Sequence, residues 1–107
     1  MPRWLSSILS HIHELAEAGK FRLTAKAFDE LSSLAFGLDP DDVRDVLLAL
    51  TASDSAGRLR SAVTDEWMYV WKPEVFETVL YIKLIVRGDC VIVSFHEDEG
   101  GRHEEAP

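Results

Sequence analysis

The segment LYIKLIVRGDCVIVSFHE, residues 80–97, decides the fold of this chain. Two runs rich in β-branched residues flank Gly88-Asp89, which is typical of a β-hairpin with a two-residue loop. Glycine would supply the positive φ that the first loop position requires. Because loop length fixes the register of a hairpin, the opposing residues follow directly. The predicted cross-strand pairs are Arg87–Cys90, Val86–Val91, Leu84–Val93, Ile82–Phe95 and Tyr81–His96.

This register sorts the hairpin side chains into two faces, because successive strand residues point to opposite sides. One face is wholly apolar and consists of Leu80, Ile82, Leu84, Val86, Val91, Val93 and Phe95. The other face becomes polar toward the open end and consists of Tyr81, Lys83, Ile85, Ile92, Ser94 and His96. A polar strand face is usually only a solvated surface. Here, however, it gathers a phenol, an ammonium, a hydroxyl and an imidazole, which are groups that transfer protons and bind anions.

The first half of the chain has a helical pattern. Apolar residues at three- and four-residue spacing predict one helix ending near Gly19 and a second one capped by Thr24. Asp39 and Pro40 predict the start of a third helix. The predicted buried stripes are Leu5, Ile8, Ile12 and Leu15; Ala27, Phe28, Leu31 and Leu34; and Val43, Val46, Leu47 and Leu50. The composition of residues 51–57 predicts a loop.

The second half has a strand pattern. Residues 59–63 predict a short edge strand, and Trp67 begins an alternating run that Pro73 ends. A long strand then starts at Val75 and enters the hairpin. Helices followed by strands predict an α+β domain, with N-terminal helices packed on one face of a small antiparallel sheet. The apolar hairpin face is then covered, and the face with Tyr81 stays open.

Composition limits the class of protein. The 107 residues predict a single domain at 1–96, followed by an acidic tail at 97–107 that we expect to be disordered. The formal net charge of −8 argues against a general nucleic-acid binder. No apolar run approaches the roughly 18 residues of a membrane span. The single cysteine, Cys90, permits no internal disulfide, so we expect a cytoplasmic protein.

The sequence predicts no metal or cofactor site. His11 and His13 are two residues apart on a predicted helix and therefore point to different faces. No pair of cysteines, glycine-rich phosphate loop or GxSxG motif occurs in the sequence.

Several segments together resemble the MqsR family of bacterial toxins, over about residues 15–97. They are LAEAGKFRLT (15–24), FGLDPDDV (36–43), LTASD (50–54), the strand from Trp67 to Lys72-Pro73, and VLYIKLIVRGDCVIVSFHE (79–97). The resemblance implies a RelE-like fold and metal-free endonucleolytic cleavage of mRNA without a cofactor. It also implies a cognate antitoxin with a zinc-binding part and a helix-turn-helix DNA-binding part.

The resemblance also implies functional positions. A functional tyrosine of the family falls on Tyr81, and a functional lysine falls on His96. A second functional lysine falls near Ala56-Gly57, where Arg58 is the nearest cation, and a functional glutamine falls on Met68. This chain therefore keeps one of these side chains and departs from the family at the others.

The residues themselves suit metal-free RNA cleavage, which needs a base, an acid and positive charge on the phosphorane. Histidine titrates near neutral pH, so His96 suits either proton-transfer role. A tyrosine hydroxyl stays protonated there, so Tyr81 is a better donor than base. Arg58 is the third catalytic candidate, because arginine grips phosphate bidentately.

Arg60 and Lys83 are RNA-binding candidates because, with Arg58, they could place positive charge on the phosphate. Lys83 matches no functional position of the family, however, so a solvated strand lysine is the simpler interpretation. Trp67 is the third RNA-binding candidate, because an aromatic strand row could stack bases. Such a row is more often packing. The leading hypothesis is a toxin endoribonuclease that arrests growth. The alternative is a non-catalytic protein-binding module of the same fold, which inhibits a cellular partner or only engages its antitoxin.

Overall fold

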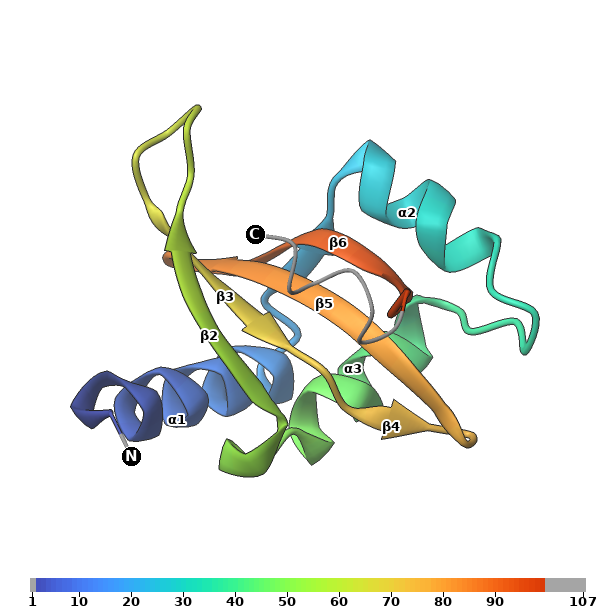
Figure 1. Cartoon of the computed structure of the whole chain (residues 1–107), viewed down its shortest axis with the longest axis horizontal. Helices are drawn as coiled ribbons and strands as arrows, with labels where there is room; N and C mark the ends of the chain where they lie inside the picture. The colour runs from blue at the N-terminus through green and yellow to red at the C-terminus, as the bar shows by residue number, and fades with distance from the viewer. Residues whose placement is uncertain (1, 100–107) are drawn as a thin grey trace.

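Three α-helices and a six-stranded sheet make up the part of the chain that the computed structural model describes, residues 2–99 (Figure 1). In chain order the elements are α1 (Arg3–Glu17), β1 (Phe21–Leu23), α2 (Ala25–Ser32), α3 (Pro40–Ala49), the 3-10 helix η1 (Ala52–Asp54), β2 (Ser55–Arg60), β3 (Trp67–Trp71), β4 (Glu74–Val75), β5 (Thr78–Val86) and β6 (Cys90–Glu97). The predicted α+β architecture with N-terminal helices is confirmed.

The sheet has the strand order β1-β6-β5-β3-β2, and β4 pairs with β5 off this path. β1 runs parallel to β6, whereas the other neighbours are antiparallel. The sheet is therefore mixed: the predicted small antiparallel sheet carries one additional parallel strand, β1. A strand of three residues is too short to give a period-two signal, so β1 could not be distinguished from a loop between helices.

The helices take up two different positions against the sheet. In Figure 1, α1 and α3 lie against one face, while α2 runs beside β6. The side chains of Lys26 and Glu30 on α2 approach the backbone of β6 at Val93 and Phe95. Because α2 covers a sheet edge, it buries a narrow stripe, and Phe28 is 48% exposed although the sequence predicted it to be buried.

The core lies between the sheet and the α1–α3 layer. Its sheet residues are Tyr69, Trp71, Leu80, Ile82, Leu84, Cys90, Ile92 and Phe95. The predicted helix starts are confirmed where side-chain caps were expected. Thr24 Oγ1 accepts a hydrogen bond from the N–H of Ala27 at 3.1 Å, and Asp39 forms a capping box with Asp42.

The hairpin register is correct at its open end and wrong near its turn. The pairs Tyr81–His96 and Ile82–Phe95 are as predicted. The loop, however, holds three residues, 87–89, so Val86 opposes Cys90. Gly88 does not have the positive φ that was predicted for it.

The three-residue loop displaces the pairing of β5 with β6 by one residue, and a β-bulge at Val93 restores the predicted register. Leu84 pairs with Ile92 and Lys83 pairs with Ser94, so Val93 is left without a partner on β5. Cys90 and Ile92 therefore point into the core in place of the predicted Val91 and Val93. The polar end of the open face keeps the predicted arrangement.

Two other strand boundaries differ from the predictions. β2 begins at Ser55 instead of residue 59, inside the predicted loop. The strand predicted from Val75 is interrupted by a turn in which Phe76 and Glu77 have positive φ values of 53° and 63°. β4 and β5 flank this turn as a second hairpin.

The fold continues slightly beyond residue 96. β6 includes Glu97, and the N–H of Asp98 donates to the carbonyl of Val79 at 2.8 Å. Residues 100–107 of the expected acidic tail lie outside the described residues. Among residues 2–99, no helix combines the length and the apolar character needed to span a membrane.

Candidate active site

Tyr81 and His96 stack on each other on the open face of the sheet. Their ring centroids are 5.1 Å apart and the ring planes differ by 13°. Both side chains are half-buried, whereas Ile82 and Phe95, the next residues on each strand, are fully buried in the core. Since adjacent strand residues face opposite ways, the stacked pair lies on the side away from α1 and α3, as predicted.

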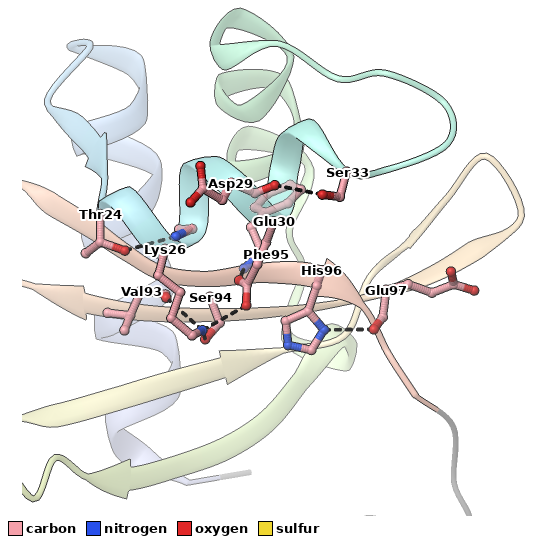
Figure 2. A network of polar contacts seen from close by, with 11 residues as sticks. Thr24, Lys26, Asp29, Glu30, Ser33, Val93, Ser94, Phe95, His96 and Glu97 are labelled. Carbon is pink, nitrogen blue, oxygen red and sulfur yellow. Dashed lines mark hydrogen bonds and ion pairs between the residues drawn. The ribbon is translucent and has the colours of Figure 1, made fainter.

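The imidazole of His96 is oriented by a backbone group. Its Nδ1 lies 2.8 Å from the carbonyl oxygen of Glu97 (Figure 2). A carbonyl oxygen only accepts hydrogen bonds, so Nδ1 carries the proton of the neutral ring. The other ring nitrogen, Nε2, then holds the free lone pair and is the atom that can accept a proton from a substrate.

Two lysines flank the ring of Tyr81. The Nζ atoms of Lys72 and Lys83 each lie 6.0 Å from its centroid. On the antiparallel pair β3–β5, Trp71 pairs with Ile82, so the next residue, Lys72, stands opposite Tyr81. Lys72 and His96 therefore lie on opposite sides of Tyr81, because β3 and β6 flank β5. Lys83 is two residues along β5 and shares the same face. Sequence reasoning singled out Lys83 but missed Lys72, because only the pairing of β3 with β5 brings Lys72 here.

The lysines of this face differ in how their charge is balanced. Lys72 Nζ lies 3.5 Å from Asp98 Oδ1. Lys26 Nζ lies 2.9 Å from Glu30 Oε2 (Figure 2). Lys83, in contrast, makes no ion pair with any residue between 2 and 99.

Lys83 is also partly removed from water. It lies between the buried side chains of Val70 on β3 and Ser94 on β6, which are its cross-strand partners. Burial lowers the pKa of Lys83, the nearby charge of Lys26 lowers it further, and Glu30 opposes the change. The open face therefore presents a half-buried ammonium group beside the stacked pair.

Glu30 fastens α2 to the strand that carries His96. Its Oε1 accepts a hydrogen bond from the N–H of Phe95 at 2.9 Å (Figure 2). Burial raises the pKa of Glu30, but hydrogen bonds from Lys26 and Phe95 outweigh this and hold the pKa below its ordinary value. This carboxylate satisfies an N–H of the sheet edge one residue before His96. It therefore fixes the position of the strand end.

A pocket of about 600 Å³ opens beside His96, between α2 with its following loop and the end of β6. Its walls include Asp29, Glu30, Ser33, Phe36 and Glu97. The pocket gives the imidazole an open approach from the side of α2.

The structure does not bring Arg58, Arg60 and Trp67 to the stacked pair. The guanidinium carbon of Arg58 lies 4.7 Å from the ring centroid of Trp4 on α1 and 3.9 Å from that of Trp67. Arg60 lies 4.2 Å from the Trp67 centroid. Arg58 pairs with Tyr69, a core residue, so these side chains stand on the helix side of the sheet. We call Trp4, Arg58, Arg60 and Trp67 the arginine–tryptophan cluster.

Comparison with known proteins agrees with the resemblance noted in the sequence. A family model described as "Motility quorum-sensing regulator, toxin of MqsA" matches residues 6–97. The chain belongs to the MqsR toxin family. The mRNA interferase toxin MqsR of Escherichia coli (strain K12) is 33% identical to this chain over 91 residues, which cover 83% of this chain and 90% of that protein. The observed architecture is compatible with the RelE-like fold expected for the MqsR family.

The other two functional positions that the resemblance to the MqsR family implied, Met68 and Ala56-Gly57, lie on β3 and β2. Met68 shares the open face with Lys83, because Met68 and Val70 point the same way on β3 and Val70 pairs with Lys83. Ala56 and Gly57 lie in an irregular part of β2, where Gly57 has a φ of 98°. Arg58 follows directly but is a paired strand residue, so its side is fixed by the sheet.

The possible metal ligands and the single thiol of this MqsR-family chain can be located in the structure. Residues 2–99 contain no group of three or more His, Cys, Asp or Glu side chains arranged to hold a metal ion. Cys90 is fully buried, and burial raises the pKa of its thiol to about 12. A buried neutral thiol is unreactive, so Cys90 acts as a small core residue.

Proposed function

We propose that this chain is the toxin of a type II toxin–antitoxin pair and that it arrests growth by cutting mRNA endonucleolytically. Membership of the MqsR toxin family and the similarity to an mRNA interferase toxin support this function. The observation that carries the proposed chemistry is the Tyr81–His96 stack on the uncovered sheet face. It sets a proton acceptor and a proton donor side by side.

In the proposed reaction, His96 Nε2 takes the proton of the ribose 2′-OH, and the 2′-oxygen attacks the adjacent phosphorus. The bond between phosphorus and the 5′-oxygen of the next nucleotide breaks. The hydroxyl of Tyr81 gives its proton to that leaving oxygen. The products are a 2′,3′-cyclic phosphate and a 5′-hydroxyl, and solvent returns the proton from His96 to Tyr81. No metal takes part in any step.

The scaffold supports this assignment by holding both rings in place. Tyr81 lies on β5 between the buried Leu80 and Ile82, and His96 follows the buried Phe95 on β6. The carbonyl of Glu97 fixes the tautomer of His96, so the lone pair at Nε2 is available without a rearrangement. Groups oriented in this way before the substrate binds contribute to the rate by proximity.

RNA cleavage by the purified chain in EDTA tests the proposal. We expect wild-type protein to produce fragments with cyclic phosphate ends. His96→Ala and Tyr81→Phe should each lower the rate by about 10²–10⁴-fold, the usual contribution of a general acid or base. His11→Ala is the matched control, because His11 is an exposed histidine on α1. A folded His96→Ala protein that cleaves as fast as His11→Ala would overturn the proposal.

We further propose that a cognate antitoxin neutralises the toxin in the cytoplasm, where its mRNA substrate is found. The family description names MqsA as the antitoxin partner. The resemblance leads us to expect an antitoxin with a zinc-binding part and a helix-turn-helix part. Co-expression with the protein that the adjacent gene encodes should yield a complex that contains zinc. A zinc-free complex would contradict this part of the proposal.

A second candidate is a non-catalytic protein-binding module on the same fold. The net charge of −8 favours it, since RNA is a polyanion. The two candidates differ in one measurement. Only the enzyme yields RNA fragments that disappear in the His96→Ala and Tyr81→Phe proteins.

A further inference from the structure

The proposed cleavage needs positive charge on the scissile phosphate, and the expected source is not in place. Negative charge grows on the phosphate oxygens as the 2′-oxygen attacks, and catalysts stabilise it with a cation placed in advance. The sequence offered Arg58, Arg60 and Lys83 for this charge, but both arginines lie over tryptophan rings on the helix side of the sheet. The charge must come from the face that carries Tyr81.

We infer that Lys83 supplies this charge and that its ammonium group contacts a non-bridging oxygen of the scissile phosphate. The inference rests on the function proposed above. Lys83 lies on the same face as the stacked pair, with its Nζ 6.0 Å from the Tyr81 ring centroid. A phosphate bridging Tyr81 and His96 would lie within reach of this flexible side chain.

The charge balance of the open face singles out Lys83. Lys72 is paired with Asp98, and Lys26 is paired with Glu30. Each of these lysines would have to leave a carboxylate before binding phosphate fully. Across residues 2–99, Lys83 has no such partner to leave.

The surroundings of Lys83 also suit binding of an anion. Its stem packs between Val70 and Ser94, which are 4% and 2% exposed. A half-buried ammonium without a counter-ion loses hydration, and a phosphate oxygen would restore the lost interaction. A lysine whose only role was to face solvent would not need to be packed between two buried neighbours. Phosphate binding by Lys83 and simple solvent exposure of Lys83 predict different results when the residue is substituted.

Paired substitutions separate these roles. Lys83→Ala and Lys20→Ala each remove one lysine charge, and Lys20 is exposed and makes no ion pair within the described chain. We expect Lys83→Ala to lower kcat by about 10²–10³-fold with a smaller change in KM, the usual cost of losing one group that stabilises developing negative charge. Lys20→Ala should cleave within about threefold of wild type. Equal rates for the two variants, both folded by circular dichroism, would overturn the inference.

Chemical rescue identifies charge as the cause. Lys83→Cys can be aminoethylated with bromoethylamine, which rebuilds a side chain of lysine length with an ammonium at its end. Cys90 is fully buried and its thiol pKa is raised to about 12, so the folded protein should be modified at position 83 alone. Aminoethylation should restore at least a tenth of the wild-type kcat, and neutral carbamidomethylation should restore none. Equal recovery with both reagents, or recovery with neither, would contradict a role for charge.

Failure of this inference is distinguishable from failure of the proposed function. Loss of cleavage in the Tyr81→Phe and His96→Ala proteins, together with wild-type kcat in Lys83→Ala, would retain the nuclease and remove Lys83 from its mechanism. A wild-type protein without nuclease activity would remove both.

Discussion

The two faces of the sheet carry similar side chains with different surroundings. The arginine–tryptophan cluster on the helix side stacks its guanidinium groups on indole rings. On the open face, Tyr81 stacks on His96, and Lys83 stands beside them without an ion pair in the described chain. Cations and aromatic rings near each other in a sequence therefore do not by themselves indicate a nucleic-acid site. The side of the sheet on which they stand decides whether they pack or remain available.

The largest expected effect separates the two faces by activity. His96→Ala should reduce kcat/KM for RNA by about 10²–10⁴-fold. Arg58→Ala should change it by less than about threefold, because Arg58 stands on the other side of the sheet. Rates on the same RNA give the comparison. Equal losses in the two variants would show that the arginine–tryptophan cluster takes part in cleavage.

The next effect separates the faces by stability. Arg58 contacts two indole rings, so Arg58→Ala should lower the free energy of unfolding by about 1–2 kcal/mol. Tyr81→Phe keeps its ring stacked on His96 and should leave stability nearly unchanged. Urea denaturation followed by tryptophan fluorescence measures both. An unchanged midpoint for Arg58→Ala would mean that this cluster contributes little to the fold.

A smaller effect concerns the attachment of α2 to the open face. Glu30→Gln keeps an oxygen for the N–H of Phe95 but loses the charge, and should cost about 1 kcal/mol at pH 7. The folded-state pKa of Glu30 is lowered, so the unfolded chain binds more protons when the pH falls below the ordinary value of 4.5. The advantage of wild type over Glu30→Gln is therefore full above pH 4.5 and declines toward lower pH.

Urea unfolding of both proteins between pH 7 and pH 3 measures this dependence. A difference between them that grew as the pH fell would contradict the hydrogen-bonded state assigned to Glu30.

The smallest effect lies at the hairpin loop, away from both faces. Arg87 makes two hydrogen bonds to Glu66, at 2.8 and 2.7 Å, and these lower the pKa of Glu66 to about 2. Titration of the Glu66 carboxyl by NMR should return toward 4.5 in Arg87→Ala. High salt should weaken the shift in wild type, because the pair is exposed. An identical titration in both proteins would contradict the pairing.

Sequence reasoning predicted the pairing at the end of the hairpin that carries Tyr81 and His96. The alternation of Tyr81 with Ile82 and of Phe95 with His96 fixed which side each ring would take. Near the turn, the same reasoning was wrong because the loop is one residue longer than expected and Val93 is unpaired. The extra loop residue and the unpaired Val93 cancel each other, so the pattern of apolar residues does not reveal either of them.

The rest of the site depends on contacts between distant elements. Lys72 reaches Tyr81 only because β3 pairs with β5, and Lys26 reaches Ser94 from a helix at the sheet edge. The side taken by Arg58 depends on an irregularity of β2 between Ser55 and Arg58. The spacing of residues along the chain predicts none of these three arrangements. They follow from how the elements assemble.

The bulge at Val93 separates the turn of the hairpin from the end that carries Tyr81 and His96. Between the loop and the bulge, the pairing is displaced by one residue from that of a two-residue loop, and this displacement ends before Ser94. A change of one residue at positions 87–89 that was compensated at this bulge would leave Tyr81 opposite His96. The length of the loop and the alignment of the stacked pair are in this way separate properties of the hairpin.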